Sequence, residues 1–307
     1  MDKTFRLVLI IAALFSGACS QLDPKFRSIG SSVLGATGYV TDSQANSFFT
    51  AGEKLGKAAE GLTDEQEYYL GRSVSAVILA QYRPLRNNAA QLYVNKVGKV
   101  LAGFSDKPET FSGYHFLILD TDEVNALSAP GGFIFISKGF LRLLPSEDAL
   151  AAVLAHEVAH VVQGHGVKAI RSSNLTGALL LIGKEVAASQ VDPSFQELTS
   201  LFGDSVNDIT ETLITKGYSR GQEYDSDEYA AQLLVRAGYN PAALGTVLRV
   251  LEQHDGGDAG GWASTHPDPD DRLDEVEDLI ASNPEAARME SARTQRFQRS
   301  LPGLTAG

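Results

Sequence analysis

The stretch LAHEVAH at residues 154–160 constrains the fold of this sequence more than any other part of it. Residues four apart lie on one face of an α-helix, so His156 and His160 can offer two imidazole nitrogens to a single metal ion. Glu157 then lies beside the metal, where a carboxylate can accept a proton from water. The alternative is a pair of structural histidines that flank an exposed glutamate. The pattern predicts a helix with a metal site on one face.

The residues around this motif predict a buried helix that starts after Ser146. The Ser146 side chain can cap the helix, and Glu147 and Asp148 place two carboxylates in its positive first turn. Apolar residues recur along the helix, at Leu150, Val153, Leu154, Val158, Val161 and Val162. Gly164 and Gly166 follow as possible helix stops. Because such a helix is buried on most sides, it would hold metal ligands rigidly.

The first residues have the features of a targeting signal. Two basic residues precede an apolar run from Leu7 to Phe15, which has signal-peptide length and is too short to span a bilayer. Cys19 is the only cysteine, so no intramolecular disulfide can form. The small residues before it resemble a bacterial lipobox, in which the cysteine becomes the lipidated N-terminus. The alternative is an ordinary signal peptide cut near Ala18. We expect a lipoprotein-type signal peptide over residues 1–18.

Charge and composition narrow the possible functions. The formal net charge of −12 disfavours binding to nucleic acid, whose phosphates repel an acidic chain. A hydrophobic content of 43% suits one globular domain with accessory segments. We expect a tether and lead-in over residues 19–60, the folded domain over residues 61–282 and a polar tail, or a frayed helix, over residues 283–307.

Upstream of the motif, residue periodicity predicts two helices and two strands. The first helix starts near Thr63, and the second has its apolar positions at Leu92, Val94, Val97, Val100 and Leu101. The strands are Tyr114–Leu119 and Gly132–Ser137. The second strand either exposes an edge to which an extended peptide adds by main-chain hydrogen bonds, or forms a plain hairpin with the first.

Downstream, residues 167–215 form a long stretch of undetermined role. Its apolar run Leu175–Ile182 is too short to span a membrane. This run either packs on the core or forms a flap that touches lipid or substrate.

Two histidines do not complete a catalytic zinc site, which normally has three protein ligands and one open position. The metzincin pattern is disfavoured, because Gln163 and Gly166 stand where it requires glycine and histidine. Glu223 and Asp227 are four apart in a stretch that predicts another helix, so they share a face. Glu223 can be the third ligand, and Asp227 can orient a histidine through its second ring nitrogen. The alternative is a solvated acidic face, since other acidic residues lie in the same stretch.

At this point the sequence resembles a known family. Its motifs follow the order seen in the gluzincin metalloendopeptidases: Asn125-Ala126, Pro130-Gly131-Gly132, His156-Glu157-x-x-His160, Ser219-Arg220-x-x-Glu223-x-x-x-Asp227 and Ser264-Thr265-His266-Pro267. This family includes the CAAX prenyl endopeptidases, the HtpX stress proteases and the periplasmic BepA-type proteases. The resemblance covers roughly residues 60 to 282.

The resemblance implies a role for each site residue. It implies that one zinc ion (Zn2+) is bound by His156, His160 and Glu223. It also implies that Glu157 is the general base and that Asp227 orients a ligand or donates a proton. His266 would lie near the metal, where it either stabilises the developing oxyanion or binds zinc and blocks the site. A structural alternative is that His266 caps a helix over Asp268–Ser282.

These observations predict a mainly helical α+β fold, a zincin-like metalloprotease domain with a small β-sheet. The expected activity is zinc-dependent endoproteolysis of unfolded or misassembled envelope proteins, with the polypeptide bound in extended form. The expected location is the periplasmic side of the bacterial envelope, at the outer membrane, through lipid on Cys19. The alternative is a non-proteolytic chaperone or assembly factor on the same fold, whose zinc is structural or capped by His266.

Overall fold

The computed structural model describes residues 62–172, 217–254, 262, 266, 269–277 and 284–304, all within the unit Leu62–Gly307. The predicted signal peptide, the tether and the run Leu175–Ile182 therefore lie outside the described residues. In chain order, the elements are α4 (Asp64–Gln81), α5 (Asn88–Phe104), β1 (His115–Leu119), β2 (Ala126–Ala129), η1 (Pro130–Gly132), β3 (Phe133–Ser137), α6 (Lys138–Leu143), α7 (Glu147–Val162), α8 (His165–Ser172), α11 (Arg220–Arg236), α12 (Ala242–His254), α14 (Pro269–Glu277) and α15 (Pro284–Ser300).

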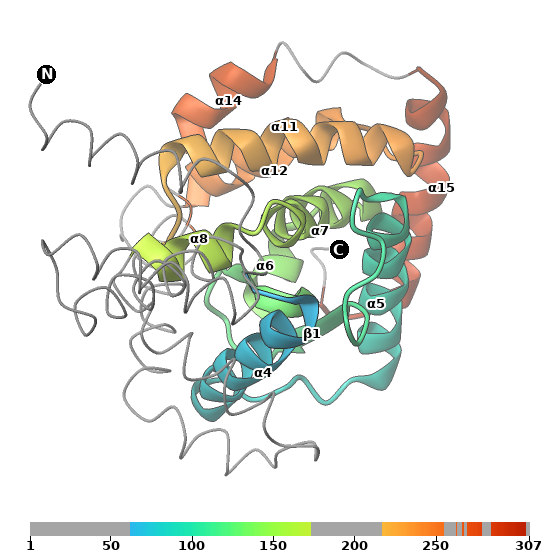
Figure 1. The fold of residues 1–307 in the computed structure, drawn as a ribbon. Coiled ribbons are helices and arrows are strands. Elements are labelled where there is room, and N and C mark those ends of the chain that lie inside the picture. The colour runs from blue at the N-terminus through green and yellow to red at the C-terminus, as the bar shows by residue number, and fades with distance from the viewer. Residues whose placement is uncertain are drawn as a thin grey trace, which may run out of the picture. The chain divides into compact units, whose positions relative to one another are not determined.

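Helix α7 lies at the centre of this arrangement (Figure 1). It packs against α11, α5, α12 and α15, and against β2 of the small sheet. Fifteen of its sixteen residues are buried. The Ser146 side chain accepts a hydrogen bond from the Ala149 amide, which is the N-cap that the sequence predicts. The apolar residues of α7 therefore form the middle of the main core, which α5, α11, α12 and α15 complete.

Local sequence signals explain where the neighbouring helices begin. Thr63 and Gln66 form a capping box at the start of α4, and Ser219 and Gln222 form another at the start of α11. Both starts agree with the predicted helices. On α5, however, Leu92 and Val100 are 58% and 45% exposed, so only part of the predicted apolar set faces the core.

The sheet has the strand order β1-β3-β2. β1 and β3 are parallel, whereas β2 and β3 are antiparallel. The prediction that residues 132–136 form an exposed edge is therefore wrong, because β3 is the central strand and pairs on both sides. A hairpin between β1 and β3 is also wrong, because parallel strands cannot be joined by a tight turn. The strand missed by sequence reasoning is β2, whose four residues are all buried and show no alternation.

The C-terminal segment also differs from the prediction. Of the two expectations, a polar tail or a frayed helix, the structure shows a helix, α15, over residues 284–300, and Phe297 and Leu301 are fully buried against the main core. Two arginines of this helix, Arg293 and Arg296, make ion pairs with buried carboxylates of α7. Those partners are about 145 residues away in the chain, and for this reason the segment looks solvated when it is considered alone.

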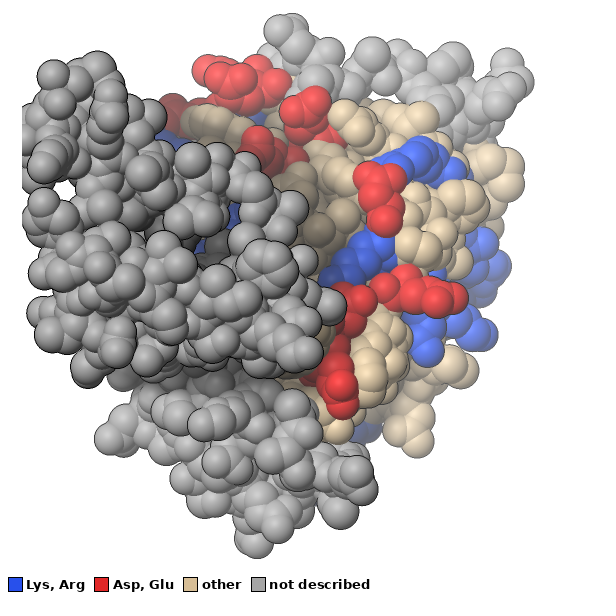
Figure 2. All heavy atoms as spheres, viewed as in Figure 1, with Lys and Arg blue, Asp and Glu red and all other residues tan. Residues whose placement is uncertain are grey.

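On the surface, acidic and basic side chains are interspersed over the described part of the face in Figure 2. Several charged side chains of the described residues form ion pairs: Lys107 contacts Asp64 and Glu67 of α4, and Arg236 of α11 contacts Asp106. Exposed ion pairs of this kind contribute about 0–1 kcal/mol each. The core around α7, and not these pairs, supplies most of the stability.

Candidate metal centre

Helix α7 directs two imidazoles to one point. His156 and His160 are separated by one helical turn, and their Nε2 atoms lie 3.0 Å apart. Each side chain is only 1% exposed. Two ring nitrogens this close, in a place without water access, require a shared proton or a shared cation.

Helix α11 brings a carboxylate to the same point. Glu223 lies in its first turn and is fully buried. One Glu223 oxygen is 3.4 Å from Nε2 of His156, and the other is 3.5 Å from Nε2 of His160. Burial opposes ionisation of this group, but the neighbouring His266 and His156 lower the pKa of Glu223 well below its usual value. The group is therefore a carboxylate that faces two imidazoles.

A third imidazole joins this group. Nδ1 of His266 lies 3.3 Å from Nε2 of His156 and 3.0 Å from Oε2 of Glu223. One nitrogen or oxygen from each of His156, His160, Glu223 and His266 lies within 4.8 Å of all the others. His266 therefore faces the cluster directly, and it does not act only as a helix cap before α14.

The composition of this group fits zinc. Imidazole nitrogens and a carboxylate oxygen are typical zinc ligands in proteins, and four of them can surround one ion tetrahedrally. Glu157 supplies a second indication. It is fully buried, and neither of its carboxylate oxygens has a hydrogen-bond partner among the described residues. Nε2 of His266 lies 3.5 Å from Oε1 of Glu157. A buried carboxylate without hydrogen bonds is costly, and this one lies next to the four-donor group.

A chain of contacts fixes the orientation of His156. Its Nδ1 lies 2.8 Å from Oδ1 of Asp227, so its Nε2 is turned toward the cluster. Arg272 of α14 holds Asp227 with two hydrogen bonds of 2.7 Å. Burial opposes ionisation of Asp227, yet Arg272 and His156 lower its pKa below the usual value. The Arg272 guanidinium also lies 4.5 Å above the Trp262 ring, which stacks on His266.

Sequence reasoning missed the residues that hold His160. Nδ1 of His160 lies 2.9 Å from Nδ1 of His165, and the Ser226 hydroxyl is within 3.3 Å of both nitrogens. His165 reaches this position because Gly164 adopts a positive φ of 65° and turns the chain back after α7. Tyr218 stacks on the His160 ring at 4.0 Å. Ser226 had a sequence signal, since it lies three residues after Glu223 on the same buried face.

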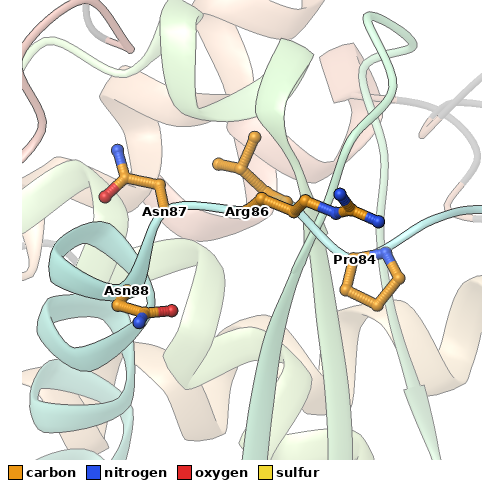
Figure 3. Close-up of a pocket in the computed structure, with 5 residues that line it drawn as sticks. Pro84, Arg86, Asn87 and Asn88 are labelled. Atoms are coloured by element: carbon orange, nitrogen blue, oxygen red, sulfur yellow. The ribbon is translucent and has the colours of Figure 1, made fainter.

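All six predicted site residues therefore come together. His156, His160, Glu223 and His266 face one another, Glu157 lies beside them, and Asp227 lies behind His156. The individual roles of these residues stay predictions. The structure also has a hollow at the turn before α5, bordered by Pro84, Arg86, Asn87 and Asn88 (Figure 3), which contains none of the six.

Comparison with known proteins decides the class of this centre. A model of peptidase family M48 matches residues 88–280, which is more than half of the chain. The chain belongs to this family. Its membership confirms the resemblance noted in the sequence and the mainly helical α+β fold class, and the buried donor group agrees with the zinc that this family binds.

Several curated relatives carry related names. The beta-barrel assembly-enhancing protease of Yersinia pestis is 26% identical over 230 residues, which cover 71% of this chain and 45% of that protein. The mitochondrial metalloendopeptidase OMA1 of Schizosaccharomyces pombe is 29% identical over 209 residues, 66% of this chain and 55% of that protein. Metalloprotease YcaL of Escherichia coli K12 is 25% identical over 168 residues, 55% of this chain and 63% of that protein. The matches thus span less than two thirds of each relative.

Proposed function

We propose that this chain is a metalloendopeptidase that cleaves unfolded or misassembled proteins of the bacterial envelope, with zinc held by His156, His160 and Glu223. The observation that carries this proposal is the pairing of a buried four-donor group with a buried carboxylate, Glu157, that has no hydrogen-bond partner in the described part of the chain. A purely structural zinc site has no need for a free base beside the metal.

Glu157, Asp227 and His266 have separate roles in the proposed peptide hydrolysis. When bound, zinc supplies a Lewis acid that polarises the scissile carbonyl and lowers the pKa of water. Glu157 accepts the proton of the attacking water and passes it to the leaving amine. Asp227, held by Arg272, keeps the Nδ1 proton on His156 and leaves its Nε2 free to bind. Nε2 of His266 lies near Glu157, where a protonated imidazole can stabilise the developing oxyanion.

The geometry of His266 also favours a latent state. Its Nδ1 lies within the donor group, so the centre has four protein ligands available where a catalytic zinc site normally keeps one position open. A chain with its zinc closed in this way binds polypeptides without cleaving them. This is the second candidate function, a chaperone or assembly factor on a peptidase fold.

Substrate binding is best explained by β2 and not by β3. Of the two edges of the sheet, the β1 edge is occupied: Gln91 of α5 donates to the Phe116 carbonyl and accepts from the Ile118 amide, at 2.6 and 3.0 Å. The Leu85 amide donates to the Ile118 carbonyl as well. These contacts replace a neighbouring strand. The remaining edge, β2, is the one that packs against the metal helix.

The register of β2 identifies the groups that face a substrate. The Ser137 amide donates to the Asn125 carbonyl, so the backbone of Asn125 faces β3. Because successive residues of an antiparallel strand face opposite sides, the backbone groups of Ala126 and Ser128 face away from β3. In agreement, the Ser128 carbonyl accepts a hydrogen bond from the Tyr218 hydroxyl. A small cavity is lined by Ser128 of β2 together with Pro130 and the metal-centre residue His160. An extended peptide can therefore add to β2 by main-chain bonds.

We also propose where the chain acts, which is the bacterial envelope. Relatives are named as beta-barrel assembly-enhancing proteases, and the sequence begins with a signal-like segment that ends at Cys19. Main-chain recognition tolerates many side chains, which suits quality control of misassembled proteins. We infer lipid attachment at Cys19, on the periplasmic side of the outer membrane. Among the described residues, no helix is both long and apolar enough to cross a membrane.

Labelling with palmitate tests the anchor. The wild-type chain should incorporate label when it is expressed in a diderm bacterium, and Cys19→Ala should lose it, because the thiol is the only lipid attachment point of this kind in the sequence. Unlabelled wild-type protein that fractionates with soluble periplasmic proteins would contradict lipidation.

Cleavage of casein by the zinc-loaded chain tests the activity. Glu157→Gln keeps the shape of the side chain but removes the base, so kcat should fall about 10²- to 10⁴-fold while the zinc content is retained. If His266 closes the fourth position of the centre, His266→Ala should cleave faster than wild type. A slower His266→Ala would assign His266 to the oxyanion. No cleavage by any zinc-loaded form would favour the chaperone.

A proline at position 128 tests the binding edge. Ser128→Pro removes an outward-facing amide without touching the bonds to β3, so KM for an extended peptide should rise about three- to tenfold, the effect of one hydrogen bond. Ser128→Ala keeps the amide and should keep the wild-type KM, which makes it the matched control. A folded Ser128→Pro with an unchanged KM would exclude β2 as the docking edge.

A further inference from the structure

The metal helix has directional contacts only near its two ends. Between Ala149 and Ala155, α7 contains only alanine, valine and leucine, and all of these are fully or almost fully buried. These side chains hold the helix by close packing, but they supply no hydrogen bond or ion pair that fixes its direction. The ionisable residues of α7 lie outside this segment. Glu147 and Asp148 occupy the first turn, and His156, Glu157 and His160 occupy the last turns.

The C-terminal helix α15 binds both carboxylates of that first turn. Nε of Arg293 donates to Oδ2 of Asp148 at 2.8 Å, and Nη2 of Arg293 donates to Oδ1 at 2.7 Å. One turn further along α15, Arg296 makes the same bidentate contact with Glu147. Its Nε donates to Oε2 at 2.6 Å, and its Nη2 donates a hydrogen bond to Oε1. Two planar guanidinium groups on two carboxylates fix distance and direction together.

Other elements complete the partners of these carboxylates. The Tyr93 hydroxyl of α5 donates to Oε2 of Glu147 at 2.5 Å, and the Tyr239 hydroxyl donates to Oε1 at 3.1 Å. The backbone amide of Asn240 donates a hydrogen bond to Oδ1 of Asp148 at 2.9 Å. Glu147 and Asp148 are at most 1% exposed, so each depends on its arginine to balance a buried charge.

The same helix is seated in the core. Phe297 and Leu301 are fully buried, and Phe297 lies 6.4 Å from the Tyr93 ring. In Figure 1, α7 begins beside α5 and α15 and ends next to α8. The family model ends at residue 280, so α15 lies beyond the matched segment.

We propose that Arg293 and Arg296 are positioning residues for the metal centre, which act through Glu147 and Asp148. Because the middle of α7 carries no hydrogen bond or ion pair from its side chains, the anchor at its first turn is one of the two places where such contacts fix the axial position and the rotation of the helix. His156 follows Glu147 by nine residues, which is about 13 Å along the helix axis. A slide or rotation at the first turn therefore moves the Nε2 atoms of His156 and His160 relative to Glu223 on α11.

This inference rests on the proposed zinc centre but not on peptidase activity, so its test includes measurements on the metal site itself. The full chain is prepared as wild type, Arg293→Ala, Arg293→Lys and Arg299→Ala. Arg299 is the matched control: it lies on α15, it is exposed, and among the described residues it is not a partner of Glu147 or Asp148. Zinc affinity is measured by competition with a chelator, and ligand geometry by the visible spectrum of the cobalt-loaded chain.

For Arg293→Ala, the expected result is a zinc affinity at least tenfold weaker, a changed cobalt spectrum and faster hydrogen exchange of the α7 amides. In casein cleavage, kcat per bound zinc should fall at least tenfold with KM within twofold, because the β2 edge is separate from α15. Arg293→Lys keeps the charge but loses the bidentate contact. Its zinc affinity and its kcat per bound zinc should therefore lie between those of wild type and Arg293→Ala. Arg299→Ala should match wild type within twofold throughout.

A folded Arg293→Ala with the wild-type zinc affinity and cobalt spectrum would overturn the proposal and leave α15 as packing alone. If Arg293→Ala does not fold, Arg293→Lys decides by the same two readouts, and wild-type values for it would equally overturn the proposal. If wild type binds zinc but cleaves nothing, the proposed peptidase function fails, while the affinity and the spectrum still report on the positioning role.

Discussion

The structure depends on the burial of a helix that carries five ionisable side chains. Each buried charge without a partner costs several kcal/mol, so a helix such as α7 is stable only if its surroundings supply partners. Arg296 and Arg293 pair with Glu147 and Asp148 at one end. At the other end, Asp227 pairs with His156, and His160 contacts Glu223 and His165. Glu157 alone lacks a hydrogen bond in this set, and it is the residue to which we assign proton transfer.

Much of the centre could be predicted because helix geometry is local. The four-residue spacing of His156 and His160 places both on one face of any α-helix, and the same spacing places Glu223 and Asp227 together on another. The capping residues Ser146 and Ser219 locate the starts of these helices from their own sequence. That the two helices meet face to face does not follow from spacing. The prediction came from the resemblance to a family, and the structure shows the contact.

The missed features depend on partners far away in the sequence. β2 is built from Ala126, Leu127, Ser128 and Ala129, which have neither alternation nor strong strand propensity, so only its pairing with β3 makes it a strand. For this reason β3 was wrongly placed at an edge. The segment of α15 reads as a polar tail or a frayed helix in the sequence, because the buried carboxylates that pair with its arginines lie about 145 residues away. The sequence gives no signal for His165, because the turn at Gly164 that brings it to the centre does not indicate what it approaches.

The most direct test of this account is anomalous diffraction at the zinc edge from a crystal of the zinc-loaded chain. The account predicts one peak per chain, bounded by the Nε2 atoms of His156 and His160 and by the carboxylate of Glu223. A peak at another place, or a chain that crystallises folded in excess zinc without a peak at this group, would contradict it.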